Sequence, residues 1–127
     1  MKKKILVIDD NIELLEEFKD ALIDSGYDVS AVSDGMKAVY AARKTRPDLI
    51  ILDLKMEPRS GFEIASELKQ RKDTASIPII AMSAFYPKEK DDWLKRFCNI
   101  SIFLKKPFSP SHIITHIEKL TEESNKP

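Results

Sequence analysis

The stretch Lys4-Ile5-Leu6-Val7-Ile8-Asp9-Asp10-Asn11 decides the fold of this chain of 127 residues. Its four apolar residues are consecutive, and a continuous run of this length is typical of a β-strand that helices cover on both faces. Two carboxylates follow at once, and apolar residues with helical spacing come after Asn11. The stretch therefore predicts a buried parallel strand that leads directly into a helix.

Further apolar runs predict three more strands, at Leu49–Leu52, Ile79–Met82 and Ile100–Leu104. A fifth candidate strand, Tyr27–Val32, is more polar, because apolar and polar residues alternate along it. This polarity favours a place at the edge of the sheet. Five strands of this kind are enough for one central sheet.

Segments with helical periodicity separate these strands. Gly26 stops the first helix, Pro47 limits the second, and Ser109-Pro110 is an N-cap followed by a first-turn proline for the last. The five predicted helices are Asn11–Asp24, a helix capped by Ser33-Asp34, a helix from Gly61 that carries Phe62, Ala65 and Leu68, the segment Lys88–Phe97, and the helix after Ser109. Five successive strand–helix units, (βα)5, imply an α/β fold: a doubly wound, five-stranded parallel sheet with helices on both faces.

Composition is that of a globular protein, since 43% of the residues are hydrophobic and 33% are charged. The length fits one domain, which is expected over residues 1–121 and is followed by a polar tail over residues 122–127. Fraying of the chain is expected from Thr121 onward. The 21 basic and 21 acidic side chains cancel, so the chain lacks the broad positive field that direct nucleic-acid or membrane binding needs. No apolar run is long enough to span a membrane, and the single Cys98 forms no internal disulfide, so a cytoplasmic location is expected.

Polar residues follow the strands directly, at the edge where parallel α/β sheets bind their ligands. Asp9 and Asp10 follow the first strand, and Asp53 follows the third. Ser83 follows the fourth strand and Lys105-Lys106 the fifth. Three carboxylates, a hydroxyl and an ammonium are therefore expected to converge.

Three close carboxylates repel one another unless a cation compensates their charge. Mg²⁺ is the expected cation, because it prefers oxygen ligands and is usually held by one or two carboxylates and a phosphate; Mn²⁺ is the alternative. The lysine is then left to pair with an anion, and the serine to hydrogen-bond it. Together these groups have the chemistry of phosphoryl transfer to a carboxylate.

Five stretches carry a resemblance to a known family: Lys4–Asn11, Pro47–Met56, Ser60–Glu63, Pro78–Ala84 and Phe103–Phe108. In this order and at this spacing they resemble the receiver domain of two-component response regulators, over about residues 3–121. The chain is similar to single-domain chemotaxis regulators in particular. The resemblance implies the flavodoxin-like strand order 2-1-3-4-5.

The resemblance also implies a role for each charged residue of the expected site. Asp53 would accept the phosphoryl group, and Lys106 would pair with Asp53 or with the phosphoryl oxygens. Asp10, Asp53 and the backbone carbonyl of Lys55 would ligate the metal directly. Asp9 would act through a metal-bound water.

Two further residues form the switch that the resemblance implies. Ser83 would move to hydrogen-bond the phosphoryl group, and Phe103 would rotate inward as Ser83 moves. An acyl phosphate adds roughly two negative charges and three strong acceptors, which can pull a hydroxyl and an ammonium inward. The Lys106–Pro107 peptide bond is expected to be cis, as in the family.

The resemblance implies partners as well. A histidine kinase or histidine phosphotransfer protein would donate the phosphoryl group, and an effector would bind the face of helix 4, strand 5 and helix 5. A homodimer linked to phosphorylation is a further expectation. Magnesium-dependent self-phosphorylation from a donor and slow self-dephosphorylation are the only reactions expected, so the chain is not expected to be an enzyme.

The sequence departs from the family pattern at three places. Pro58 stands one position later than usual in the loop before Gly61, and Asn99 replaces a usual glycine before the last strand. Lys55 and Phe85 lie two residues beyond Asp53 and Ser83. We expect the cationic Lys55 and the apolar Phe85 to slow hydrolysis of the phosphoryl group.

Three other functions are open on sequence alone: a receiver-like interaction module that is not phosphorylated in vivo, a flavin mononucleotide binder, and a hydrolase with an aspartyl nucleophile. The complete set of site positions argues against the first, and Asp9-Asp10 would repel the flavin's phosphate. In isolation, Asp9-Asp10 could merely cap a helix. His112 and His116 lie four residues apart, but outside the apolar stripe of their helix, so they are expected on a solvated face.

Overall fold

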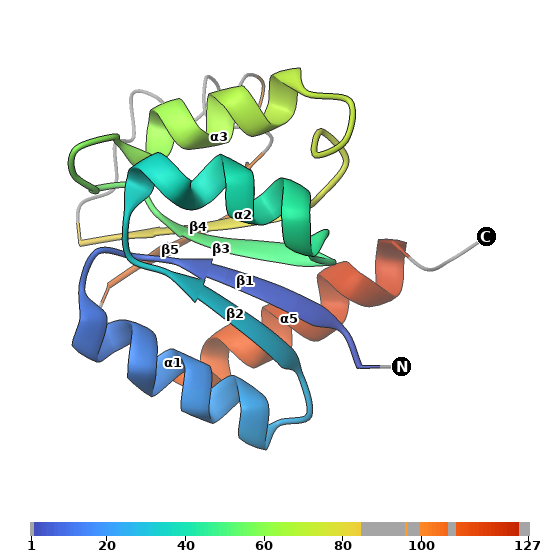
Figure 1. The fold of residues 1–127 in the computed structure, drawn as a ribbon. Coiled ribbons are helices and arrows are strands. Elements are labelled where there is room, and N and C mark those ends of the chain that lie inside the picture. Colours follow the sequence, from blue (N-terminus) through green and yellow to red (C-terminus); the bar gives the residue numbers. More distant parts are fainter. Residues whose placement is uncertain (1, 85–95, 97–99, 107–108, 125–127) are drawn as a thin grey trace.

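A five-stranded parallel sheet forms the centre of the molecule, with helices on both of its faces (Figure 1). The structure, a computed structural model, describes residues 2–84, 96, 100–106 and 109–124. The strands are β1 (Lys4–Ile8), β2 (Asp28–Val32), β3 (Leu49–Asp53), β4 (Ile79–Ser83) and β5 (Ile100–Lys105). Their order is β2-β1-β3-β4-β5, so the predicted fold class and strand order are confirmed.

The continuous apolar runs occupy the middle of the sheet. Every residue of β3 and β4 is buried, as are the last four residues of β1. The more polar β2 lies at one edge, as predicted, and β5 lies at the other. The pairing of β4 with β5 contains a register shift, since Ile79 pairs with Ile100 but Ile80 pairs with Ile102.

The described helices are α1 (Ile12–Asp24), α2 (Ala38–Thr45), α3 (Gly61–Gln70) and α5 (Pro110–Ser124). Side-chain caps open two of them: the side chain of Asn11 accepts a hydrogen bond from Leu14 N, and that of Ser60 accepts one from Glu63 N. The predicted helix over residues 88–97 lies outside the described residues apart from Arg96, and Asn99 also lies outside them.

Two helix boundaries differ from the prediction. Asp34 caps a short 3₁₀ helix, η1 (Gly35–Lys37), and α2 begins only at Ala38. At the other end of the chain, α5 continues to Ser124, although fraying was expected from Thr121. Thr121 is buried because its hydroxyl donates to the carbonyl of Ile117, which satisfies the polar group within the helix.

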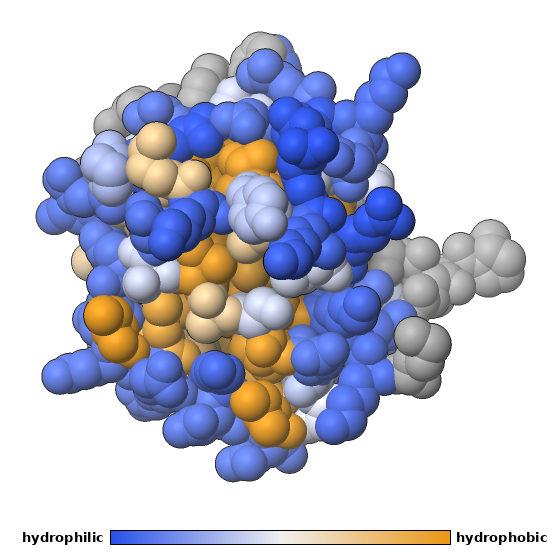
Figure 2. Space-filling model, viewed as in Figure 1, coloured by the Kyte–Doolittle hydropathy of each residue, from blue (hydrophilic) through white to orange (hydrophobic). Residues whose placement is uncertain are grey.

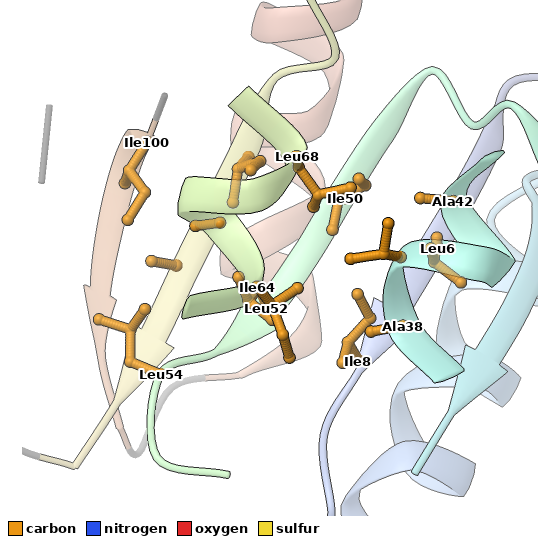
Figure 3. Close-up of a cluster of buried hydrophobic side chains, with 14 of the residues drawn as sticks. Leu6, Ile8, Ala38, Ala42, Ile50, Leu52, Leu54, Ile64, Leu68 and Ile100 are labelled. Carbon is orange, nitrogen blue, oxygen red and sulfur yellow. The ribbon is translucent and has the colours of Figure 1, made fainter. Parts of the chain in front are cut away.

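Helices α2 and α3 cover one face of the sheet, and α1 and α5 cover the other (Figure 1). Alternate strand residues enter two different cores: Leu6 and Ile50 pack beneath α2 and α3 (Figure 3), while Ile5 and Ile51 pack against α1 and α5. Because both faces are covered, neighbouring residues are all apolar, which explains the continuous runs. Full burial of each such side chain contributes roughly 1.5–3 kcal/mol.

The face of the molecule shown in Figure 2 is largely hydrophilic. In the view of Figure 2, apolar atoms show mainly over the β2 edge, between α1 and α2. Within the described part of the chain, the large apolar side chains that are exposed are Ile12, Ile23, Met36 and Tyr40. Among the described residues, no helix combines the length and the apolar character that crossing a membrane requires.

Candidate functional site

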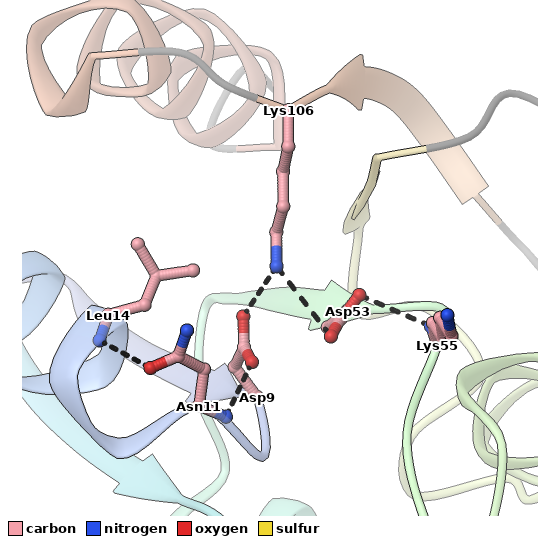
Figure 4. A network of polar contacts seen from close by, with 6 residues as sticks. All are labelled: Asp9, Asn11, Leu14, Asp53, Lys55 and Lys106. Carbon is pink, nitrogen blue, oxygen red and sulfur yellow. Dashed lines mark hydrogen bonds and ion pairs between the residues drawn. The ribbon is translucent and has the colours of Figure 1, made fainter.

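Asp9 lies directly after β1 and is 1% exposed. Its Oδ1 accepts a hydrogen bond from the N–H of Asn11 at 2.9 Å, and its Oδ2 accepts one from Nζ of Lys106 at 3.0 Å (Figure 4). Asn11 in turn caps α1. The strand end and the helix start therefore hold the Asp9 carboxylate in one orientation.

Asp53 is the last residue of β3 and is 5% exposed. Its Oδ1 accepts a hydrogen bond from the N–H of Lys55 at 3.2 Å, while its Oδ2 lies 3.6 Å from Nζ of Lys106. The two oxygens thus have different partners, as Figure 4 shows. One faces the backbone of the following loop and the other faces an ammonium.

Lys106 follows β5, and its side chain extends between the two carboxylates (Figure 4). Its backbone N–H donates to the carbonyl of Ser83 at 2.7 Å, which fixes the start of the side chain beside the end of β4. Lys105, its neighbour, is exposed. The predicted single ammonium at the site is therefore that of Lys106.

Asp10 completes an acidic cluster. One carboxylate oxygen each from Asp9, Asp10 and Asp53 can be chosen so that all three lie within 4.8 Å of one another, although Asp10 is exposed. Burial above all, and then the charge of Asp9, raise the pKa of Asp53 to about 6, against the opposing effects of Lys106 and of the Lys55 N–H. Among the residues that the structure describes, the Lys106 ammonium alone pairs with these groups and does not balance three carboxylates. A cation therefore fits here, and three carboxylate oxygens are donors suited to Mg²⁺.

Ser83 and Phe103 lie on neighbouring strands but at different distances from the charged groups. Ser83 ends β4, is 7% exposed, and pairs in register with Lys105. Phe103 pairs with Ala81, inside the sheet, and packs against the core beneath α2 and α3. The structure therefore places Ser83 at the same sheet edge as the carboxylates and Phe103 two register positions away.

Gly61 is a site residue whose importance sequence reasoning missed. It was expected only to start a helix, yet a Cβ at this position would lie 2.3 Å from the carbonyl oxygen of Asp53 and 2.6 Å from Cα of Leu54. The N–H of Gly61 also donates to the carbonyl of Leu54 at 3.0 Å. The first turn of α3 therefore packs directly on the backbone that carries Asp53, which only glycine permits.

Some expectations about the site's surroundings fall on residues that are not described. Phe85 and Pro107 lie outside the described residues, and so does the expected cis bond before Pro107. Within the loop after β3, where the proline is displaced, the Glu57–Pro58 peptide bond is cis. The side chain of Lys55 in this loop is exposed.

Three known proteins illustrate what the chain is similar to. The polar-differentiation response regulator DivK of Brucella anthropi is 30% identical over 118 residues, which cover 93% of this chain and 95% of DivK. The chemotaxis response regulator CheY4 of Vibrio cholerae has a similar structure, with a TM-score of 0.86 and 28% identity over 94% of this chain and 99% of that one.

The third, the receiver domain of sensor histidine kinase PA1611 from Pseudomonas aeruginosa, has a TM-score of 0.85 and 24% identity over 96% of this chain and 99% of that one; its structure has a magnesium ion coordinated in the active site cleft. At this identity the likeness concerns the fold. The response regulator receiver domain family matches residues 5–118. The match ends within α5 and spans most of the chain. Because of this extent, the chain belongs to the family of response regulator receiver domains.

Proposed function

We propose that this receiver domain accepts a phosphoryl group on Asp53 from a histidine kinase or a histidine phosphotransfer protein, and that the new charge switches the binding of a partner. The observation that carries the proposal is the environment of Asp53. One oxygen of this buried carboxylate faces the Lys106 ammonium, and two further carboxylates lie close by. This is a site with a nucleophile, a counter-charge and donors for a metal.

The chain's own residues account for much of the proposed transfer. An oxygen of Asp53 attacks the phosphorus, forms the new bond to it, and the bond to the donor's leaving group breaks, with its electron pair going to that group. The Lys55 N–H holds Oδ1, so the carboxylate cannot turn freely. The Lys106 ammonium, 3.6 Å from Oδ2, is placed to neutralise charge on the incoming phosphoryl oxygens.

A divalent cation is part of the proposal. Asp10, Asp53 and the backbone carbonyl of Lys55 would hold Mg²⁺ directly, Asp9 through a water, and Mn²⁺ is the alternative. The close carboxylates and the raised pKa of Asp53 support a cation here, and PA1611 of the same fold has magnesium in its active site cleft. When bound, the metal supplies positive charge for the oxygens of the transferred group.

Ser83 and Phe103 are the proposed switch. Ser83 is joined to Lys106 through the hydrogen bond from the Lys106 N–H to its carbonyl. A displacement of either residue toward the phosphoryl group is thus coupled to the other. Phe103 lies on β5, beside β4, which supports its proposed inward rotation as Ser83 moves.

The proposal also covers the location of the domain, its partners and its oligomeric state. The domain acts in the cytoplasm within two-component signalling or a phosphorelay, and it binds its effector through the face of helix 4, β5 and α5. A homodimer linked to phosphorylation is included. The chain performs only its own phosphorylation and slow dephosphorylation, so it is a signalling protein rather than an enzyme.

Intact-mass spectrometry tests this function directly. Wild type, Asp53→Asn and the control Asp20→Asn, an exposed acid on α1, are incubated with Mg²⁺ and a small acyl-phosphate donor. We expect one phosphoryl adduct on wild type and on Asp20→Asn, lost with a chelator and absent from Asp53→Asn. No adduct on folded wild type would favour the interaction module that is not phosphorylated.

A further inference from the structure

The loop from Leu54 to Ser60 connects the proposed phosphate acceptor to α3, and its two ends touch. The N–H of Gly61 donates to the carbonyl of Leu54, and the first turn of α3 leaves no room for a Cβ beside Asp53. Lys55, at the start of the loop, donates its N–H to Asp53 Oδ1. The loop is therefore linked to the orientation of the Asp53 carboxylate through this hydrogen bond.

The far end of the loop rests on another part of the fold. Gly35 is buried at the start of η1, and a Cβ there would lie 2.8 Å from the carbonyl oxygen of Arg59. Figure 1 shows the green loop after β3 beside the beginning of α2. The backbone of Arg59 therefore lies directly against the turn between β2 and α2.

The side chain of Arg59 ties the same point to α3. Its guanidinium forms a hydrogen-bonded ion pair with the carboxylate of Glu67, two turns along the helix. The two side chains are 25% and 36% exposed, so the pair is partly shielded from water. Residue 59 thus packs closely against Gly35 through its backbone and is bonded to Glu67 through its side chain.

We propose that Arg59 and Glu67 are positioning residues for Asp53: their ion pair holds the loop so that the Lys55 N–H stays on Oδ1 and leaves Oδ2 facing Lys106. Neither residue touches the reacting atoms. This inference rests on the proposed function for its consequence on phosphorylation. The structural part of the inference, that the ion pair keeps the Lys55 N–H in place, does not depend on that function.

The first test uses the metal-free protein. Amide hydrogen exchange at Lys55 is measured by NMR in wild type, Arg59→Met and Glu67→Gln. We expect exchange about two- to fivefold faster in both variants, the change that loss of a partly exposed ion pair supports. The initial rate of phosphoryl uptake from the small donor, followed by intact mass, should fall by a similar factor.

A matched control is the ion pair of Arg43 and Asp73, which also lies on the α2 and α3 side but is about half exposed. Arg43→Met and Asp73→Asn should leave Lys55 exchange and phosphoryl uptake at wild-type values. The double variant Arg59→Glu/Glu67→Arg reverses the pair and should return both readouts to wild-type values, because it rebuilds the same attraction. Simple loss of packing would not be restored in this way.

The outcomes separate this inference from the proposed function. If Arg59→Met and Glu67→Gln behave like the control variants, or if the reversed pair restores neither readout, the positioning role is wrong. If wild type takes up no phosphoryl group, the proposed function fails, while Lys55 exchange in the metal-free protein still decides whether the pair holds the loop.

Discussion

Asp53 makes the stability of the metal-free domain depend on pH. Its pKa of about 6 in the folded protein lies above the value of 3.8 for an unperturbed aspartate, chiefly because the carboxylate is buried. Between these two values the folded state binds more protons than the unfolded state, so stability falls as the pH rises through this window. At neutral pH the ionised Asp53 therefore destabilises the fold.

The substitution Asp53→Asn removes this destabilising negative charge. We expect it to raise the free energy of unfolding by about 1–3 kcal/mol at pH 7.5 in the presence of a chelator, and by much less at pH 4, where Asp53 is protonated in the folded protein. Urea denaturation at both pH values measures the change. The exposed Asp20→Asn should change little, and an equal gain from it would contradict the prediction.

His116 on α5 has a lowered pKa, caused first by burial and then by the nearby His112 and Lys119. The two histidine rings are 5.2 Å apart. The unfolded state therefore binds a proton more readily than the folded state, and stability falls as the pH drops through the unfolded value near 6.5. Both residues lie on α5 and were expected on its solvated face, but His116 is half-buried.

Replacing His112 with Gln should raise the pKa of His116, because a neighbouring positive charge is removed. The pKa should still stay below the usual value near 6.5, since burial, the larger cause, remains. An NMR titration of the His116 ring measures both. Lys119→Gln serves as the control and should give a smaller rise.

Lys55 has an exposed side chain beside the proposed acceptor, two residues beyond Asp53. We expect Lys55→Ala to shorten the lifetime of the phosphoryl group severalfold, since the cation no longer hinders the approach or the activation of water. Phe85→Ala should act in the same direction. Mass spectrometry of the decaying adduct gives the lifetimes, with Lys72→Ala as the control, and unchanged lifetimes in both variants would overturn this view.

At the scale of elements, the contact of α3 with the end of β3 is the tightest constraint on the site. Gly61→Ala would place a methyl group 2.3 Å from the Asp53 carbonyl oxygen. We expect a loss of about 1–3 kcal/mol of stability, as for other overpacked positions, together with slower phosphoryl uptake. Denaturation and mass spectrometry measure these effects. Ser66→Ala on the same helix should leave phosphoryl uptake unchanged.

The elements also show what sequence could predict. Runs such as Leu49–Leu52 identified the central strands, because a strand that is buried on both faces is made almost entirely of apolar residues. The rule that polar residues follow strands brought Asp9, Asp53 and Ser83 to one edge correctly, since it depends only on strand direction.

Features that depend on tertiary packing escaped prediction. Gly61, at the start of α3, packs against Asp53, at the end of β3. A local sequence pattern does not show how close two such elements lie in space. Burial of Thr121 was missed because a threonine can satisfy its hydroxyl within its own helix, so its polarity is a poor sign of exposure. Lys106, rather than Lys105, was predicted from the family resemblance, because the strand pattern by itself leaves the end of β5 uncertain by a residue.

At the scale of the whole molecule, metal binding and folding should be linked, because a cation bound only by the folded state stabilises it. At a Mg²⁺ concentration 100 times the dissociation constant, the expected gain is about 2.7 kcal/mol. Thermal unfolding with Mg²⁺ and with a chelator measures this gain. Asp10→Asn should reduce it, whereas Asp20→Asn should not, and equal gains in all three proteins would exclude a metal at this cluster.

The irregular pairing of β4 with β5 has a consequence for solubility. A flat outer strand offers its free backbone groups as a template on which another chain can add a strand, and such addition begins aggregation. The register shift at Ile79 and Ile80 disrupts the ladder at the start of β5, and a strand with this kind of irregularity twists away from a flat partner. The opposite outer strand, β2, is only five residues long and begins with the exposed Asp28. Both outer strands are thus poor templates, and we expect the domain to keep its continuous apolar strands from pairing edge to edge with those of another copy at high concentration.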